Sequence, residues 1–155
     1  MLLVDAWTAC AYHRYKQLDL LMPPIIEAAH IGETLGYERL SVDPEKGVLR
    51  ARYAGRQAFS NGRDIVQGGM QAAMLDNVMA LTAMAHLGEG FHITTLEMKI
   101  SHLSPAPLGN LIAEGRIIKR GRKIMFMEAT LFDEEENVLA IATTTARIVA
   151  IKPES

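Results

Sequence analysis

One aspartate inside an apolar, helix-forming segment is the residue of this sequence best suited to chemistry. Asp76 lies within residues 68–87, which are rich in Ala, Met and Leu and predict one long helix. Aspartate is unfavourable in a helix interior, and burying its charge without partners costs free energy. In a pocket, such a carboxylate can act as a general base or as a nucleophile. The alternative interpretation places Asp76 and Asn77 on a narrow stripe that faces solvent or a subunit interface.

The residues that lead into this helix could stabilise a developing negative charge. Gln67-Gly68-Gly69 precedes the apolar segment, and the free N–H groups of a first helical turn carry a partial positive charge. Glycine also lets a ligand approach the backbone closely, so this turn could supply the donors that an oxyanion needs. The amide of Asn61 could position a water molecule or a carbonyl group. Each of these residues alone also fits an ordinary turn, so the functional interpretation depends on their combination with Asp76.

Other kinds of catalytic site find little support. The five histidines show no metal-ligand spacing and Cys10 is the single cysteine, so we expect no metal site. Ser60 and Ser101 lack the Gly-x-Ser-x-Gly pattern of a serine hydrolase, and no glycine-rich nucleotide-binding motif is present. We therefore expect neither a metal nor a bound cofactor.

Composition indicates an ordinary globular protein. The chain has 155 residues, of which 49% are hydrophobic and 22% charged, and this favours a single domain. A net charge of -2 gives no reason to expect a nucleic-acid partner. With a single cysteine, no intramolecular disulfide can form, which favours a cytoplasmic location. The start of the chain lacks a basic region typical of a signal peptide, and polar residues interrupt the apolar segment 70–87, so we expect no membrane span.

The order of predicted elements indicates an α+β fold. Two short helices are expected at 5–21 and 25–33, and a hairpin of two strands at 37–42 and 48–53 is joined by the turn 43–47. After the helix at 68–87, four more strands are expected at 92–103, 110–119, 122–132 and 138–151. Because the intervening turns are short, we expect consecutive strands to be antiparallel neighbours.

A helix that is apolar on nearly every face must be surrounded by protein. A curved antiparallel sheet could cover one side of it, and the uncovered side and the strand edges would then favour a homo-oligomer. We expect residues 1–35 to form an N-terminal helical extension and residues 36–155 to form the α+β domain.

The motif formed by Asn61, Gln67-Gly68-Gly69 and Asp76 resembles hotdog-fold thioesterases of the PaaI-like, phenylacetic acid degradation group. Segments 101–110, 119–122 and 133–146 also resemble that family's strand end, Gly-Arg turn and last hairpin. The resemblance covers roughly residues 37–151. It implies a hotdog fold, in which a curved antiparallel sheet wraps around one long central helix.

The resemblance also implies an activity and a set of site residues. The expected reaction is hydrolysis of an aryl- or fatty-acyl-CoA to the free acid and CoA. Asp76 matches the residue that activates water or attacks the thioester carbonyl, and Asn61 matches an asparagine that orients the water or the thioester. Gly68 matches the residue whose N–H polarises the carbonyl. Thr95 matches a strand position that carries Ser or Thr near the acid in some members.

Substrate binding and assembly follow from the same resemblance. Gly69 and the turn Arg120-Gly121-Arg122 match positions expected to contact substrate, with the turn meeting the nucleotide end of CoA; a solvated basic turn is the alternative. The family's active site lies between two protomers, so Asp76 is expected to face Asn61 and Gln67 of the partner subunit. A homodimer and a homotetramer built from two dimers both fit this expectation.

Gln67 departs from the family pattern, which has histidine at this position. Glutamine can donate and accept hydrogen bonds, but it does not titrate near neutral pH. A non-catalytic hotdog protein that binds acyl-CoA is therefore an alternative function. A hydratase or dehydratase of the same fold fits less well, because the helix start has no histidine.

Overall fold

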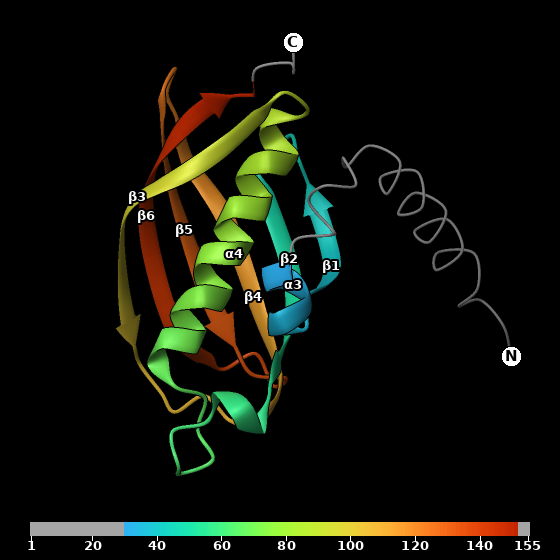
Figure 1. Ribbon diagram of the computed structural model, residues 1–155, viewed down its shortest axis with the longest axis vertical. Helices are drawn as coiled ribbons and strands as arrows, with labels where there is room; N and C mark the ends of the chain where they lie inside the picture. The colour runs from blue at the N-terminus through green and yellow to red at the C-terminus, as the bar shows by residue number, and fades with distance from the viewer. Residues whose placement is uncertain (1–29, 152–155) are drawn as a thin grey trace, which may run out of the picture.

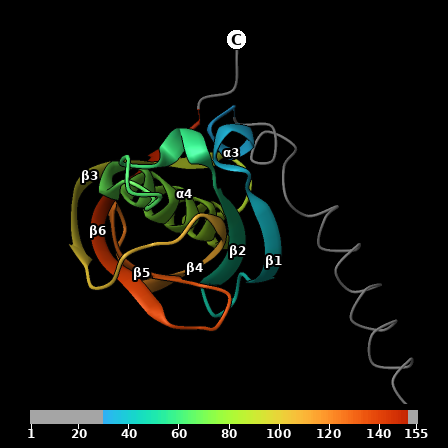
Figure 2. The ribbon, with the colours of Figure 1, turned by 90° about the horizontal axis from the view of Figure 1, so that it is seen from below.

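A six-stranded antiparallel sheet curves around one long helix, α4 (Gly68–Leu87), in the computed structural model, which describes residues 30–151. Figure 1 shows α4 lying along one face of the sheet, and Figure 2 shows the sheet curving around it. The other elements are α3 (His30–Leu35), β1 (Glu38–Asp43), β2 (Val48–Gly55), the 3-10 turn η1 (Gln57–Phe59), β3 (Phe91–His102), β4 (Gly109–Arg120), β5 (Ile124–Phe132) and β6 (Val138–Ala150). The predicted α+β architecture, with one central helix and a curved antiparallel sheet, is confirmed.

The strands follow the order β1-β2-β4-β5-β6-β3, and every neighbouring pair is antiparallel. Three predicted hairpins are confirmed, namely β1–β2, β4–β5 and β5–β6. In each of them, a short turn that contains Gly, Asp or Asn reverses the chain.

The expectation that β3 and β4 are neighbours is wrong. β3 pairs with β6 at one edge of the sheet, whereas β4 lies between β2 and β5. The two strands are three strand spacings apart, about 14 Å, and residues 103–108 can cross this distance because an extended chain covers about 3.3 Å per residue. Within this connection, Ala106 is buried and accepts a hydrogen bond from the N–H of Val66 (2.9 Å). The short connection therefore crosses beneath the start of α4 instead of forming a hairpin.

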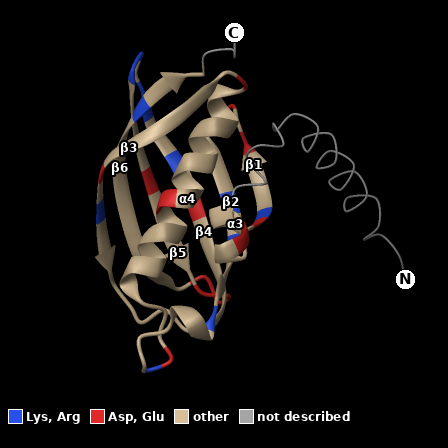
Figure 3. Cartoon of the chain, viewed as in Figure 1, with Lys and Arg blue, Asp and Glu red and all other residues tan. Residues whose placement is uncertain are grey.

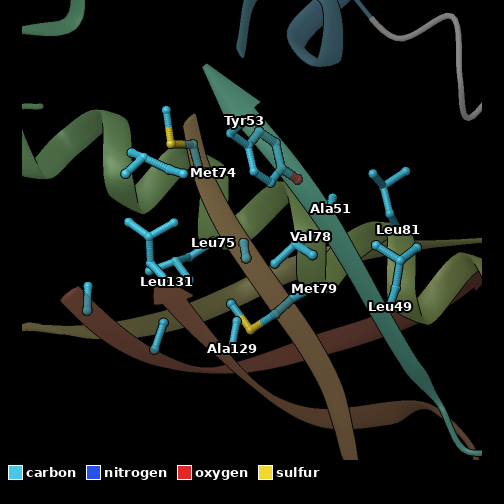
Figure 4. Close-up of a cluster of buried hydrophobic side chains, with 14 of the residues drawn as sticks. Leu49, Ala51, Tyr53, Met74, Leu75, Val78, Met79, Leu81, Ala129 and Leu131 are labelled. Carbon is cyan, nitrogen blue, oxygen red and sulfur yellow. The ribbon is translucent and has the colours of Figure 1, made fainter. Parts of the chain in front are cut away.

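The core lies between α4 and the concave face of the sheet. Alternate residues of β2 and β5 are buried, as expected when one face of a sheet covers a helix. Figure 4 shows apolar side chains of α4 pointing toward those of β2 and β5. Fully buried members of this cluster are Leu49, Tyr53, Met74, Leu75, Val78, Met79 and Leu131. The methionines are flexible enough to fill irregular gaps between the helix and the curved strands.

Two contacts hold α4 at a fixed place on the sheet. Tyr53 donates a hydrogen bond from its hydroxyl to Oδ1 of Asn77 (2.8 Å), and burial, with a smaller effect of nearby Tyr37, raises the pKa of Tyr53 so that it remains a neutral donor. At Gly115 the helix backbone comes very close to β4. A Cβ atom there would contact the Thr82 hydroxyl and lie 2.9 Å from the Val78 carbonyl oxygen. Glycine at this position therefore permits the close approach of helix and sheet.

The predicted N-terminal helices fall largely outside the described residues. The helix predicted at 5–21 lies entirely outside them, and of the one predicted at 25–33 only the last part is described. There the helix α3 runs from His30 to Leu35 and ends before Gly36, which has a φ of +67°. A domain boundary after residue 35 stays a prediction. Within residues 30–151, no helix is both long enough and apolar enough to cross a membrane.

The close approach at Gly115 makes a first prediction. We expect Gly115→Ala to lower the free energy of unfolding by about 1–3 kcal/mol, because the added methyl group would overlap the backbone of α4. Urea denaturation at a fixed protein concentration measures this change. Gly32→Ala is the matched control, since a Cβ at that helical position makes an ordinary 3.7 Å contact with Tyr37. Equal stability of the two variants would contradict the close approach.

Candidate active site

Asp76 lies in the middle of α4 on the side that faces the edge strand β3. Its carboxylate is half-buried, and Oδ1 accepts a hydrogen bond from the Thr95 hydroxyl at 2.9 Å. An irregularity in the β3–β6 register between Thr95 and Glu97 determines which β3 side chains face the helix. Because Leu96 is the extra residue, both Thr95 and Met98 can face α4. The structure thus brings together two of the predicted site residues, from elements far apart in the sequence.

The start of α4 presents backbone donors beside an open space. Gln67 is the N-cap residue, with φ −59° and ψ 143°, but its exposed side chain makes no capping hydrogen bond. Gly68 and Gly69 begin the helix. Apart from the adjacent residues and the backbone of α4 itself, no atom of the described residues lies within 4 Å of the position that a Cβ on Gly69 would take, so the backbone is accessible there. This opening is where a carbonyl oxygen could approach the N–H groups of the first turn.

His102 also lies at the helix start, although the sequence analysis did not identify it as a site residue. A Cβ atom on Gly68 would lie 2.9 Å from Nε2 of the His102 ring. The ring nitrogen Nδ1 is 3.0 Å from Oε1 of the buried Gln71 side chain, whose Nε2 donates to the Val66 carbonyl oxygen at 2.7 Å. The alternation of β3 places His102 on the concave face with Ile100, and that pattern is readable in the sequence. Its proximity to Gly68 depends on the crossing of the chain to the edge of the sheet.

Other predicted site residues lie apart from this region. Asn61 is in an exposed loop, where its Oδ1 accepts a hydrogen bond from the N–H of Arg63 (3.1 Å), and no contact joins it to Asp76 within the chain. Arg120, Gly121 and Arg122 form the β4–β5 turn at the end of the sheet opposite the start of α4 (Figure 1). Figure 3 shows this turn coloured blue for lysine and arginine residues. The roles predicted for these residues stay predictions.

The two parts of the candidate site are too far apart to act together within one chain. The eight-residue separation of Gly68 and Asp76 along α4 corresponds to about 12 Å at ~1.5 Å per residue. A thioester carbonyl is far smaller, so one carbonyl cannot contact the helix start and Asp76 of the same chain. We therefore distinguish an oxyanion half-site, Gly68, Gly69 and His102, from a carboxylate half-site, Asp76 and Thr95.

The surface of the single chain agrees with this division. Two shallow hollows lie on the outer face of the sheet, lined chiefly by residues of β3, β5 and β6, and neither includes Asp76 or Gly68. Among residues 30–151, no group of three His, Cys, Asp or Glu side chains could hold a metal ion. The two half-sites present a carboxylate, a hydroxyl, an imidazole and backbone N–H donors.

Comparisons with known proteins identify the family. The thioesterase superfamily model matches residues 64–140. A solved structure from Ralstonia eutropha JMP134, described as a "putative thioesterase, phenylacetic acid degradation-related protein", is 33% identical with a TM-score of 0.76, and the match covers 82% of this chain and 98% of that one. A Streptococcus mutans protein solved with bound acetyl CoA has the same fold, with 22% identity, a TM-score of 0.67 and coverage of 76% and 91%.

A curated relative from Haemophilus influenzae, named "Putative esterase", is 24% identical over 85 residues, which are 55% of this chain and 62% of that protein. The chain thus spans about three fifths of the length of this relative. Together with the fold, the comparisons show the class of protein: this is a hotdog-fold protein of the thioesterase superfamily. The chain belongs to the PaaI-like group within it, as the motif around Asp76 predicted.

Proposed function

We propose that this protein hydrolyses an aryl- or fatty-acyl-CoA thioester to the free acid and CoA. Membership of the thioesterase superfamily supports thioester hydrolysis as the reaction class. The observation that carries the proposal is the Asp76 carboxylate, the only acidic side chain of α4, which is oriented by the Thr95 hydroxyl at 2.9 Å. Nothing in the core requires a carboxylate at this position, whereas activation of water does.

The proposed site combines half-sites from two protomers. Because Gly68 and Asp76 of one chain are about 12 Å apart, Asp76 of the partner subunit has to approach the helix start. The two edges of the sheet differ in a way that supports this arrangement. Both edge strands contain a register irregularity, but β1 has only six residues, most of them half-buried, whereas β3 has twelve residues, most of them exposed. A long uncovered edge favours pairing with another chain, so we propose β3 as the dimer contact.

The proposed reaction needs no group beyond these side chains, the substrate and water. Asp76 takes a proton from water as the oxygen attacks the thioester carbonyl carbon, and the N–H groups at Gly68 and Gly69 of the partner subunit bind the resulting oxyanion. The intermediate collapses by breaking the C–S bond, and the departing thiolate takes the proton from Asp76. The products are the carboxylic acid and the free thiol. Thr95 holds Asp76 in place through its hydrogen bond.

The β4–β5 turn suits the phosphate groups of CoA. Lys119, Arg120, Arg122 and Lys123 are all exposed, and none of them forms a salt bridge with any part of the chain between residues 30 and 151. Their positive charge is therefore available to an anionic ligand. The S. mutans protein that shares this fold was solved with acetyl CoA, which supports a CoA thioester as the ligand.

A binding function without turnover is the second candidate. The Gln67 side chain is exposed at the helix start and, among the described residues, makes no hydrogen bond. It adds no group that titrates near neutral pH to the oxyanion half-site. Tight binding of acyl-CoA by the wild-type protein without release of CoA would support this candidate and contradict the hydrolase.

Replacement of the carboxylate tests the hydrolase directly. We expect Asp76→Asn to lower kcat by about 100-fold or more, because the amide cannot accept the proton of water. Release of free thiol from a panel of aryl- and fatty-acyl-CoA substrates measures this change. Asp64→Asn, a similar change on an exposed loop, is the control and should leave kcat within about twofold of the wild type. Wild-type kcat in Asp76→Asn would remove Asp76 from the mechanism.

Removal of one backbone donor tests the oxyanion half-site. Gly68→Pro deletes the N–H group, and proline is accepted at the first helical position after an extended residue such as Gln67. Gly68→Ala keeps the N–H group and meets the same His102 contact, so it is the matched control. We expect kcat to be about 100- to 1000-fold lower in the proline variant than in the alanine variant.

Mixing the two inactive variants tests whether the site is shared. Mixed dimers of co-expressed Asp76→Asn and Gly68→Pro chains, freed of both homodimers, should show about half of wild-type activity, because each mixed dimer has one intact site and one site altered in both halves. Activity is measured after purification through two different affinity tags. No recovery in the mixed dimer would place both half-sites within one chain and contradict the shared site.

Neutralising the basic turn tests the CoA end of the site. We expect the double variant Arg120→Ala, Arg122→Ala to raise KM for an acyl-CoA by about three- to tenfold at low salt. KM for the same acyl group on N-acetylcysteamine, which lacks the phosphates, should not rise. Lys46→Ala, at a different hairpin turn where the lysine already pairs with Asp43 (3.1 Å), is the control. An equal effect on both substrates would contradict a phosphate contact.

A further inference from the structure

The His102 imidazole is an unassigned polar group in the oxyanion half-site. His102 is the last residue of β3, and its side chain lies on the concave face of the sheet. Its Nε2 lies 2.9 Å from the position that a Cβ on Gly68 would take. The side chain faces the helix but is exposed, because α4 covers the edge strand only in part. His102 thus faces the space that a ligand at the helix start would occupy.

A chain of hydrogen bonds determines which ring nitrogen carries the proton. The Val66 carbonyl oxygen can only accept, so the Gln71 side chain must direct its amide nitrogen there, at 2.7 Å. The Gln71 oxygen is then the atom that faces Nδ1 of His102, at 3.0 Å, and Nδ1 must donate to it. In the neutral ring the proton therefore sits on Nδ1, and Nε2 keeps a free lone pair. Because Gln71 is buried, this orientation is held firmly.

We propose that Nε2 of His102 is a substrate-binding acceptor that takes a hydrogen bond from the pantetheine amide N–H next to the thioester. This inference rests on the proposed function. Apart from the exposed Gln67 side chain, the other polar groups at the helix start are backbone N–H donors, which suit a carbonyl oxygen but cannot receive an N–H group. The amide of the pantetheine arm is joined to the thioester sulfur by a short ethylene link. A substrate whose carbonyl lies at Gly68 therefore carries a donor to the neighbourhood of His102.

The chemistry of the ring distinguishes this role from simple packing. If His102 only covered Gly68, a phenyl ring of similar size would fill the same space without orienting a lone pair. The buried Gln71 would then have an oxygen without a donor, which is unfavourable. Instead, the hydrogen bonds from Val66 through Gln71 to His102 hold Nδ1 toward the protein interior. The acceptor atom Nε2 then faces the site.

Matched variants and matched substrates test the proposal. His102→Asn keeps a nitrogen donor near the position of Nδ1 and lacks the Nε2 acceptor, whereas His102→Gln can carry an oxygen to the Nε2 position. The substrates are one acyl group joined to N-acetylcysteamine, which has the amide, or to a simple alkyl thiol, which does not. We expect His102→Asn to lower kcat/KM about three- to tenfold more for the amide-containing thioester than for the alkyl thioester.

The expected loss lies in KM rather than kcat, and His102→Gln should recover part of it. His92→Asn, an exposed histidine at the other end of β3, is the control and should not discriminate between the two thioesters. Equal losses for both thioesters in His102→Asn, or no loss for either, would overturn the proposal while leaving thioester hydrolysis intact.

A second measurement does not depend on turnover. In the 15N NMR spectrum of the wild-type protein, the His102 ring should show a proton on Nδ1 and a free Nε2. Saturation with a non-hydrolysable thioether of pantetheine should shift the Nε2 resonance in the direction of an acceptor that gains a hydrogen bond. An unchanged Nε2 resonance at saturation would overturn the proposal. Absence of any thioester hydrolysis would overturn the proposed function instead, so the two failures are distinguishable.

Discussion

Burial of α4 against the concave face of the sheet is the constraint on which the rest of the structure depends. A helix with apolar side chains on nearly every face is unstable in water, so the strands have to curve around it. The backbones come close enough at Gly115 that a side chain there would overlap the helix. Because α4 is rigid and cannot slide along the sheet, the positions of its polar side chains relative to the strands are also fixed.

The length of that helix divides the candidate site. Gly68 and Asp76 are on the same rigid element, so their separation of about 12 Å cannot close by a loop movement. A second protomer that pairs along β3 would solve this geometric problem, because a two-fold axis brings unlike ends of two helices together. The exposed edge strand and the divided site thus point to the same proposed assembly.

The position of β3 at the edge of the sheet determines which side chain lies at the oxyanion half-site. Gln67 offers neither a cap nor a titratable group to the start of α4. His102 reaches the same place from the edge strand, and Gln71 orients it from within the helix. An imidazole is therefore present beside Gly68 although the residues adjacent to Gly68 in the sequence do not include one.

The sequence by itself determined the central helix, the strands between residues 37 and 151 and the chemical family, whereas the helix predicted at 5–21 lies outside the described residues. Apolar helix formers at 68–87 predicted α4 with its observed ends, and turn residues predicted three hairpins, because both signals are local. The motif of Asn61, Gly68 and Asp76 indicated the thioesterase superfamily. Only the tertiary structure decided that β3 lies at the edge, that Thr95 donates to Asp76 and that His102 lies against Gly68. These contacts depend on which strands pair across the whole sheet. The short connection from β3 to β4 does not specify that the two strands pair with each other.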